Sequence, residues 1–78
     1  MPHVIVKMWP GPSEKQKKRL AEQIVEDVVA TLESADESVS VDIEEVKPSD
    51  WLEKVYRPEI EPRMAKLYKR PGYRPSDL

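Results

Sequence analysis

The first regular pattern along the chain is a short β-branched run at about residues 3–9. Val4, Ile5 and Val6 form its centre, and Pro10-Gly11-Pro12 follows it directly. The two prolines have no amide proton to donate to a β-ladder, so the run must end there. We predict a strand over residues 3–9. Its imperfect alternation indicates that both of its faces are at least partly covered.

A helical pattern occupies about residues 13–33. Apolar residues recur at four-residue steps, at Leu20, Ile24, Val28 and Leu32. This spacing places them on one stripe of a helix, and charged residues fill the opposite face. Ser13 and Gln16 have the spacing of a capping box, in which each side chain accepts from the other residue's backbone amide. We therefore predict one long amphipathic helix that begins at Ser13.

The period changes again at about residues 39–46. Val39, Val41 and Ile43 alternate with polar residues, which is typical of a strand with one buried face. A strand, a long helix and a second strand make a βαβ unit, so the strands should be parallel with a right-handed crossover. The fold class is α/β. A two-stranded parallel sheet is marginal by itself, and a second copy of the chain is the simplest source of cover.

The remaining residues are less regular. Pro48-Ser49-Asp50 begins a short helical turn over about residues 49–55, and a second amphipathic helix is predicted over about residues 58–69. Pro62 must then lie in the first turn of that helix or kink it. Pro71-Gly72 ends the helix and leaves residues 71–78 as a tail. No linker divides the chain, so we predict a single domain over residues 1–78.

Composition limits the classes of function. The chain has 78 residues and no cysteine, so no disulfide stabilises its small core, and oligomerisation is expected. The net charge of -2 argues against a nucleic-acid-binding protein. No apolar run approaches the roughly 18 residues of a membrane span, and the N-terminus lacks the layout of a signal peptide. We expect a cytoplasmic protein that binds neither nucleic acid nor membrane.

Familiar catalytic and metal-binding patterns are missing, and this directs attention to the start of the chain. His3 is the single histidine, and the carboxylates have no metal-ligand spacing. Removal of Met1 would give Pro2 a free secondary amine. Apolar burial and nearby cations would lower the pKa of that amine and let it act as a base that moves a proton beside a carbonyl. Taken alone, an inert terminus is the commoner interpretation of Met1-Pro2.

Several segments together resemble the 4-oxalocrotonate tautomerase family, and more specifically its dimeric, PptA-like branch. These are the proline start before a strand, the helix opening at residues 13–17, Ser38-Val39-Ser40-Val41, Pro48-Ser49-Asp50-Trp51, and residues 59–64 and 69–73. The resemblance implies a MIF-like βαβ protomer, a homodimer, and cofactor-free conversion of small enol acids such as phenylenolpyruvate. It implies Pro2 as general base and then acid, and Trp51 as an aromatic wall of the pocket.

The chain departs from the founding pattern at two positions. Where that pattern has arginines that hold a dicarboxylate, this chain has Pro12 and Ser40. A monocarboxylate aryl enol therefore fits better than a dicarboxylate. Side chains considered for the missing cation are Lys7, Arg57, Arg70 and Arg74. Ser40 and His3 are candidate substrate-binding residues, although a surface histidine on an edge strand is the commoner interpretation of His3 and a polar strand face accounts for Ser40.

Three functional hypotheses remain open. The first is an enol–keto tautomerase. The second is a dehalogenase or hydratase of small unsaturated acids that uses the same proline, and the third is a non-catalytic oligomeric binding module of the same fold. Trp51 has a second interpretation as a core residue, and the sequence does not choose between a dimer, a trimer and a hexamer.

Overall fold

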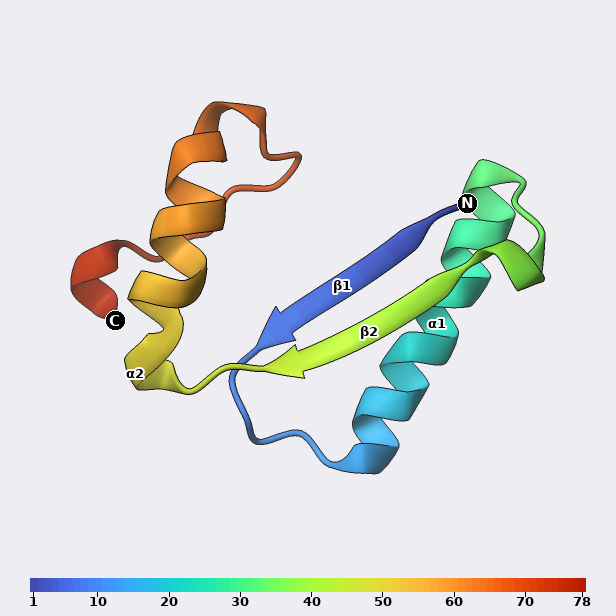
Figure 1. The fold of residues 1–78 in the computed structure, drawn as a ribbon, viewed down its shortest axis with the longest axis horizontal. Helices are drawn as coiled ribbons and strands as arrows, with labels where there is room; N and C mark the ends of the chain where they lie inside the picture. The colour runs from blue at the N-terminus through green and yellow to red at the C-terminus, as the bar shows by residue number, and fades with distance from the viewer. The chain divides into compact units, whose positions relative to one another are not determined.

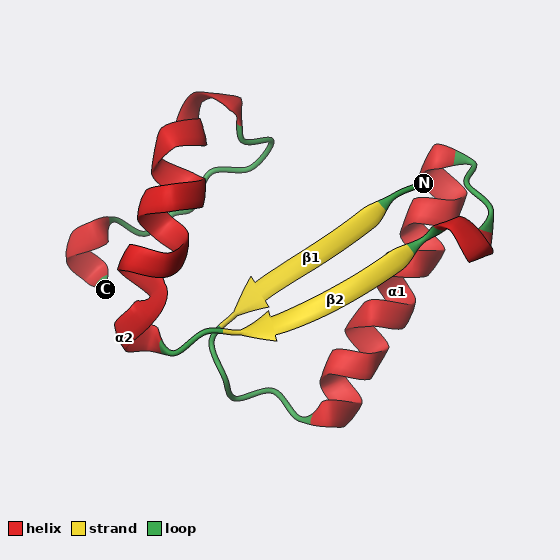
Figure 2. Ribbon diagram, viewed as in Figure 1, coloured by secondary structure: helices red, strands yellow, loops and turns green.

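The computed structural model describes residues 1–78, which form two compact units, Met1–Glu45 and Val46–Leu78. The first unit contains both strands and the long helix, and the second contains the remaining helical segments. Figure 2 shows this division of strands and helices along the chain. The single-domain organisation stays a prediction.

The first unit is a parallel βαβ arrangement. Strand β1 (His3–Met8) pairs with strand β2 (Ser40–Glu45) in parallel, from His3 opposite Ser40 to Met8 opposite Glu45. Helix α1 (Glu14–Leu32) connects the strands and packs beside β2 (Figure 1). The α/β class and the parallel pairing predicted from the periodicities are confirmed. The predicted strand bounds, 3–9 and 39–46, are slightly too long. Residue 9 of the first strand and residues 39 and 46 of the second lie outside the paired ladder.

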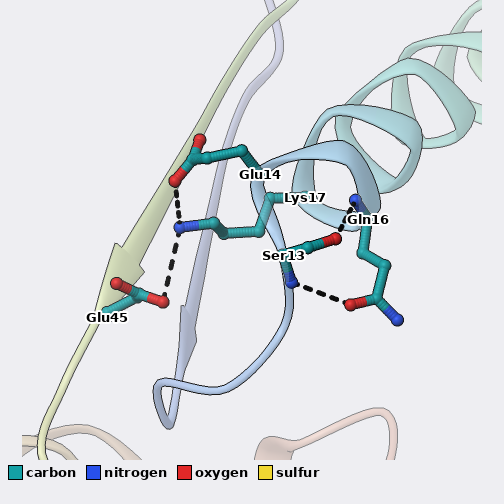
Figure 3. A network of polar contacts seen from close by, with 5 residues as sticks. All are labelled: Ser13, Glu14, Gln16, Lys17 and Glu45. Carbon is teal, nitrogen blue, oxygen red and sulfur yellow. Dashed lines mark hydrogen bonds and ion pairs between the residues drawn. The ribbon is translucent and has the colours of Figure 1, made fainter.

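Local signals at both ends of α1 explain its length. Gln16 donates its backbone amide to the Ser13 hydroxyl at 3.1 Å, and Ser13 donates its own amide to the Gln16 side chain at 2.8 Å. The predicted capping box is therefore present (Figure 3). The helix ends where Glu33 takes a left-handed conformation with φ 54°. Gly11, at φ 143°, gives the loop between β1 and α1 a conformation that other residues rarely adopt.

The first unit leaves much of its apolar surface uncovered. No residue of β1, α1 or β2 is fully buried. Val41 and Ile43 share a groove with Ala21 of α1, so this face of the sheet lies toward the helix. On the opposite face Ile5 is 48% exposed, and Leu32 at the end of α1 is 61% exposed. The unit therefore has a regular backbone but no closed core.

The second unit is one helical run whose hydrogen-bond spacing changes along its length. Helix α2 (Pro48–Trp51) continues into a π-helical segment (Leu52–Ile60) and then a 3₁₀ segment (Glu61–Lys66). The predicted gap between a turn at 49–55 and a helix at 58–69 is therefore wrong. Pro58 has no amide proton for an α-helical bond, and the wider spacing, seen where Glu61 donates to the carbonyl of Tyr56, carries the helix past it.

The end of the chain differs from the prediction as well. Helical structure stops at Lys66 and not at residue 69, and a separate 3₁₀ turn, Pro75–Asp77, lies within the predicted tail 71–78. The Arg70 side chain donates to the carbonyl of Met64 at 3.1 Å and holds the returning segment against the end of the helical run.

The core of the second unit is small but closed. Val55 and Tyr56 are each only 5% exposed. The Tyr56 ring lies against that of Tyr73, with ring centroids 6.0 Å apart and planes tilted by 51°.

No helix anywhere in the chain is long and apolar enough to cross a membrane.

Candidate functional site

Three sequence-predicted site residues meet at the start of the sheet. The Ser40 backbone amide donates to the carbonyl of Pro2 at 3.1 Å, so the parallel ladder extends one residue before β1. His3 lies opposite Ser40 in the register, and its Nδ1 is 2.6 Å from the Ser40 hydroxyl oxygen. Pro2, His3 and Ser40 therefore form a corner where backbone and side-chain bonds join the two strands.

Pro2 is the unusual member of this corner. It is partly exposed, and its nitrogen is joined to a fully exposed Met1. While Met1 is attached, that nitrogen is an amide without a basic lone pair. Removal of Met1 would leave a secondary amine at the same place, held by the bond from Ser40 to the adjoining carbonyl. The corner therefore fixes the position of the atom that the sequence singles out.

The charges of the first unit are separated along its length. Its cations all lie in residues 7–19, and no lysine or arginine occurs from Leu20 to Val46. The turn that leads into β2 carries Asp36 and Glu37, at the same end of the parallel sheet as Pro2. His3 is therefore the one basic side chain of this unit at the Pro2 end.

At the opposite end of the unit, Lys17 connects α1 to β2. Its Nζ lies 2.7 Å from Glu14 and 3.3 Å from Glu45 (Figure 3). The hydrogen bond to Glu14 raises the pKa of Lys17 above its ordinary 10.5. The bond to Glu45 acts in the same direction, and partial desolvation opposes both. This lysine also lines an open groove of about 670 Å³ with Lys15, Lys18 and Ala21. We conclude that Lys17 and its two carboxylate partners serve to hold α1 against β2.

Trp51, the predicted pocket wall, lies in the second unit. Its indole N–H donates to the Tyr73 hydroxyl at 3.0 Å, and Tyr73 in turn lies against Tyr56. The indole is only partly exposed, so the hydrogen bond fixes its orientation. Sequence reasoning missed Tyr73, because a bond between residues 22 positions apart leaves no local signal.

The cations considered as replacements for the missing arginines have their own surroundings. Arg57 pairs with Glu53 at 2.9 Å, and Arg70 is bonded to a backbone carbonyl. Lys7 lies opposite Glu44 near the far end of β1, with its Cα about 13 Å along the strand from that of His3. Arg74 adjoins the last 3₁₀ turn. In the first unit, the structure brings only His3 and Ser40 together with Pro2.

Comparison with known proteins gives consistent results. Residues 2–57 match the sequence model of a family described as tautomerase enzyme. The chain is similar to a probable tautomerase of Xylella fastidiosa, with 41% identity over 73 residues that cover 94% of this chain and 89% of that protein. It is 39% identical over 74 residues to tautomerase PptA of Cronobacter sakazakii, which covers 94% of this chain and 97% of that protein.

A solved structure agrees with the sequence matches. The crystal structure of YwhB, a homologue of 4-oxalocrotonate tautomerase, superimposes with a TM-score of 0.58 at 39% identity. The superposition covers 59% of this chain and 75% of the other. The family resemblance drawn from the residues is confirmed by these matches.

Proposed function

The chain belongs to the tautomerase family and is a keto–enol isomerase, and we propose that its reaction uses the amine of Pro2 after Met1 has been removed. The observation that carries the proposal is the match of the family model, which begins at residue 2 and covers the whole βαβ unit. The backbone bond from Ser40 that holds Pro2 in place supports it. No cofactor is needed for this chemistry.

The proposed reaction moves one proton. The unprotonated Pro2 nitrogen accepts the hydroxyl proton of an enol, which leaves an enolate. The oxygen's electron pair then forms the carbonyl as the electron pair of the carbon–carbon double bond takes a proton from the Pro2 ammonium at the adjacent carbon, which restores the free amine. Atoms and electrons balance without an oxidant. The proposed substrate is a small enol acid such as phenylenolpyruvate, with Trp51, Ser40 and His3 as substrate-binding residues.

A base of this kind needs a dry environment, and we propose that a homodimer supplies it. Pro2 is only partly covered in the single chain, and Ile5, Leu20 and Leu32 remain exposed. Burial of such surface is worth about 25 cal/mol per Å² and opposes the entropic cost of association. Association would also cover a two-stranded sheet that is marginal by itself. The cytoplasmic location stays a prediction.

The test is Pro2→Ala with phenylenolpyruvate as substrate. General acid–base catalysis contributes about 10²–10⁴-fold, so kcat/KM should fall by that factor while the circular dichroism spectrum stays the same. Pro10→Ala, in the exposed loop after β1, is the matched control and should keep full activity. Intact mass must show that Met1 is absent from both samples. Unchanged turnover by processed Pro2→Ala would rule out the mechanism.

A further inference from the structure

The bond between His3 and Ser40 has a consequence for substrate recognition. We propose that His3 binds the carboxylate of the substrate through its Nε2 and that Ser40 is the positioning residue that holds the imidazole for this task. The inference rests on the proposed function. It names the group that takes the place of the arginines absent at positions 12 and 40.

The geometry leaves one ring nitrogen for a ligand. Nδ1 is 2.6 Å from the Ser40 hydroxyl, which is able to donate to it or to accept from it. When the hydroxyl donates, the neutral ring carries its proton on Nε2; when the ring is protonated, both nitrogens are donors. Both of these states present an Nε2–H to an acceptor, whereas a neutral ring that donates from Nδ1 to the Ser40 hydroxyl has no proton on Nε2. A carboxylate is the substrate group that accepts such a bond most strongly.

The ring is also held near the reacting atom. His3 follows Pro2 directly, and Ser40 contacts both residues, through its backbone amide to Pro2 and through its hydroxyl to His3. One residue of β2 therefore fixes the base and the proposed anion-binding group relative to one another. In an enol acid of this size, the carboxylate and the reacting enol are adjacent, so two neighbouring protein groups suffice to contact both.

Other cations of the first unit lie too far away for this role. Lys7 is about 13 Å along β1 from His3 by strand rise. Arg19 precedes the end of α1 by 13 residues, a distance of about 20 Å along a helix whose far end adjoins the start of β2. Asp36, Glu37 and Asp42 are the charged groups that flank the corner, and none of them attracts an anion. His3 is the basic group that this unit offers to a carboxylate at Pro2.

A cross-strand bond with a purely structural role is the alternative, and a pair of substrates separates the two. Phenylpyruvate and its methyl ester share the exchangeable C3 proton but differ in the carboxylate. Exchange at C3 in D₂O, followed by proton NMR, gives KM and kcat for each. His3→Ala should raise KM for the acid by about 10-fold or more, because a hydrogen bond to a charged group is lost, and should raise KM for the ester by a much smaller factor, because a neutral carbonyl accepts a weaker bond.

Ser40 variants test the positioning role. Ser40→Ala should raise KM for the acid by a smaller factor than His3→Ala, and Ser40→Thr, which keeps the hydroxyl on a β-branched strand residue, should restore it. The double variant His3→Ala/Ser40→Ala should be no worse than His3→Ala alone, because both act through one bond. Circular dichroism confirms that each variant is folded. If His3→Ala does not fold, His3→Phe, which keeps a planar ring without donors, takes its place.

The outcomes test the role of His3 separately from the proposed tautomerase reaction. If His3→Ala raises KM by the same factor for the acid and the ester, or for neither, the role of His3 is overturned while the tautomerase proposal stands. Failure of the unaltered protein to exchange C3 of either compound, with Met1 removed, contradicts the proposed function itself. A KM increase that is clearly larger for the acid than for the ester supports both.

Discussion

The two units of the chain contrast in backbone regularity and in burial. Met1–Glu45 has an unbroken parallel ladder and a 19-residue helix, yet no fully buried side chain. Val46–Leu78 has a helix that changes its spacing twice, yet it contains the two buried residues, Val55 and Tyr56. Regular hydrogen bonding and core formation are thus separate properties. The unit that carries the proposed chemistry depends more on cover from outside itself.

The largest expected effect tests the closed core of the second unit. Tyr56→Ala removes a ring that is 5% exposed and that lies against Tyr73. Truncation of a buried aromatic costs about 3–5 kcal/mol, so urea unfolding should show a loss of that size. Tyr68→Ala is the matched control, since Tyr68 is fully exposed and should change stability by less than about 0.5 kcal/mol. Similar losses for the two tyrosines would contradict the contrast in burial.

A smaller effect is expected from the open surface of the first unit. If a second chain covers Ile5, Leu20 or Leu32, dilution shifts the equilibrium toward separated and unfolded chains. A tenfold rise in protein concentration should raise the thermal midpoint by about 3–5 °C for a dimer of this size. Calorimetry at two concentrations measures this, and light scattering gives the number of chains. A midpoint independent of concentration would argue for a self-sufficient monomer.

The smallest effect concerns the contact between α1 and β2. Lys17→Met removes the ion pairs with Glu14 and Glu45 and should lower the thermal midpoint slightly, whereas Lys18→Met, the neighbouring exposed lysine, should not. Because the folded-state pKa of Lys17 is raised, its stabilisation is complete below about pH 10.5 and is lost as pH rises through the folded value. The difference from the unaltered protein should therefore shrink above that pH. It should also shrink in 1 M salt.

The same contrast explains which elements could be predicted. The bounds of α1 were predicted to within one residue at each end because the Ser13–Gln16 capping box and the four-residue apolar steps are local signals. The strands were slightly overextended because their ends depend on which residues of the partner strand remain to pair. In the second unit the sequence pattern predicts a turn over 49–55 and a separate helix over 58–69, whereas one helical run passes through Pro58. The π-helical hydrogen-bond spacing, one residue wider than in an α-helix, lets the helix continue past Pro58. This change of spacing leaves no signal in the apolar periodicity of the sequence.

The candidate site divides in the same way. Pro2 could be named from the sequence because a proline directly after Met1 is a local signal. The family match, which begins at residue 2, includes it. His3 and Ser40 were named separately, but their bond follows from a register that joins residues 37 positions apart. Tyr73 was missed for the same reason, since its bond to Trp51 also joins distant segments. The role of these residues in binding stays a prediction.

The constant separation of 37 residues along the ladder also governs how the corner at Pro2 comes into being. In a parallel pair every rung closes the same loop, so the first rung to form costs at least about 3 kcal/mol of chain entropy, and later rungs cost little more. The sheet therefore assembles as one kinetic event. A nascent or partly folded chain therefore has no half-built corner, and the surroundings of Pro2 are set only when the two strands pair.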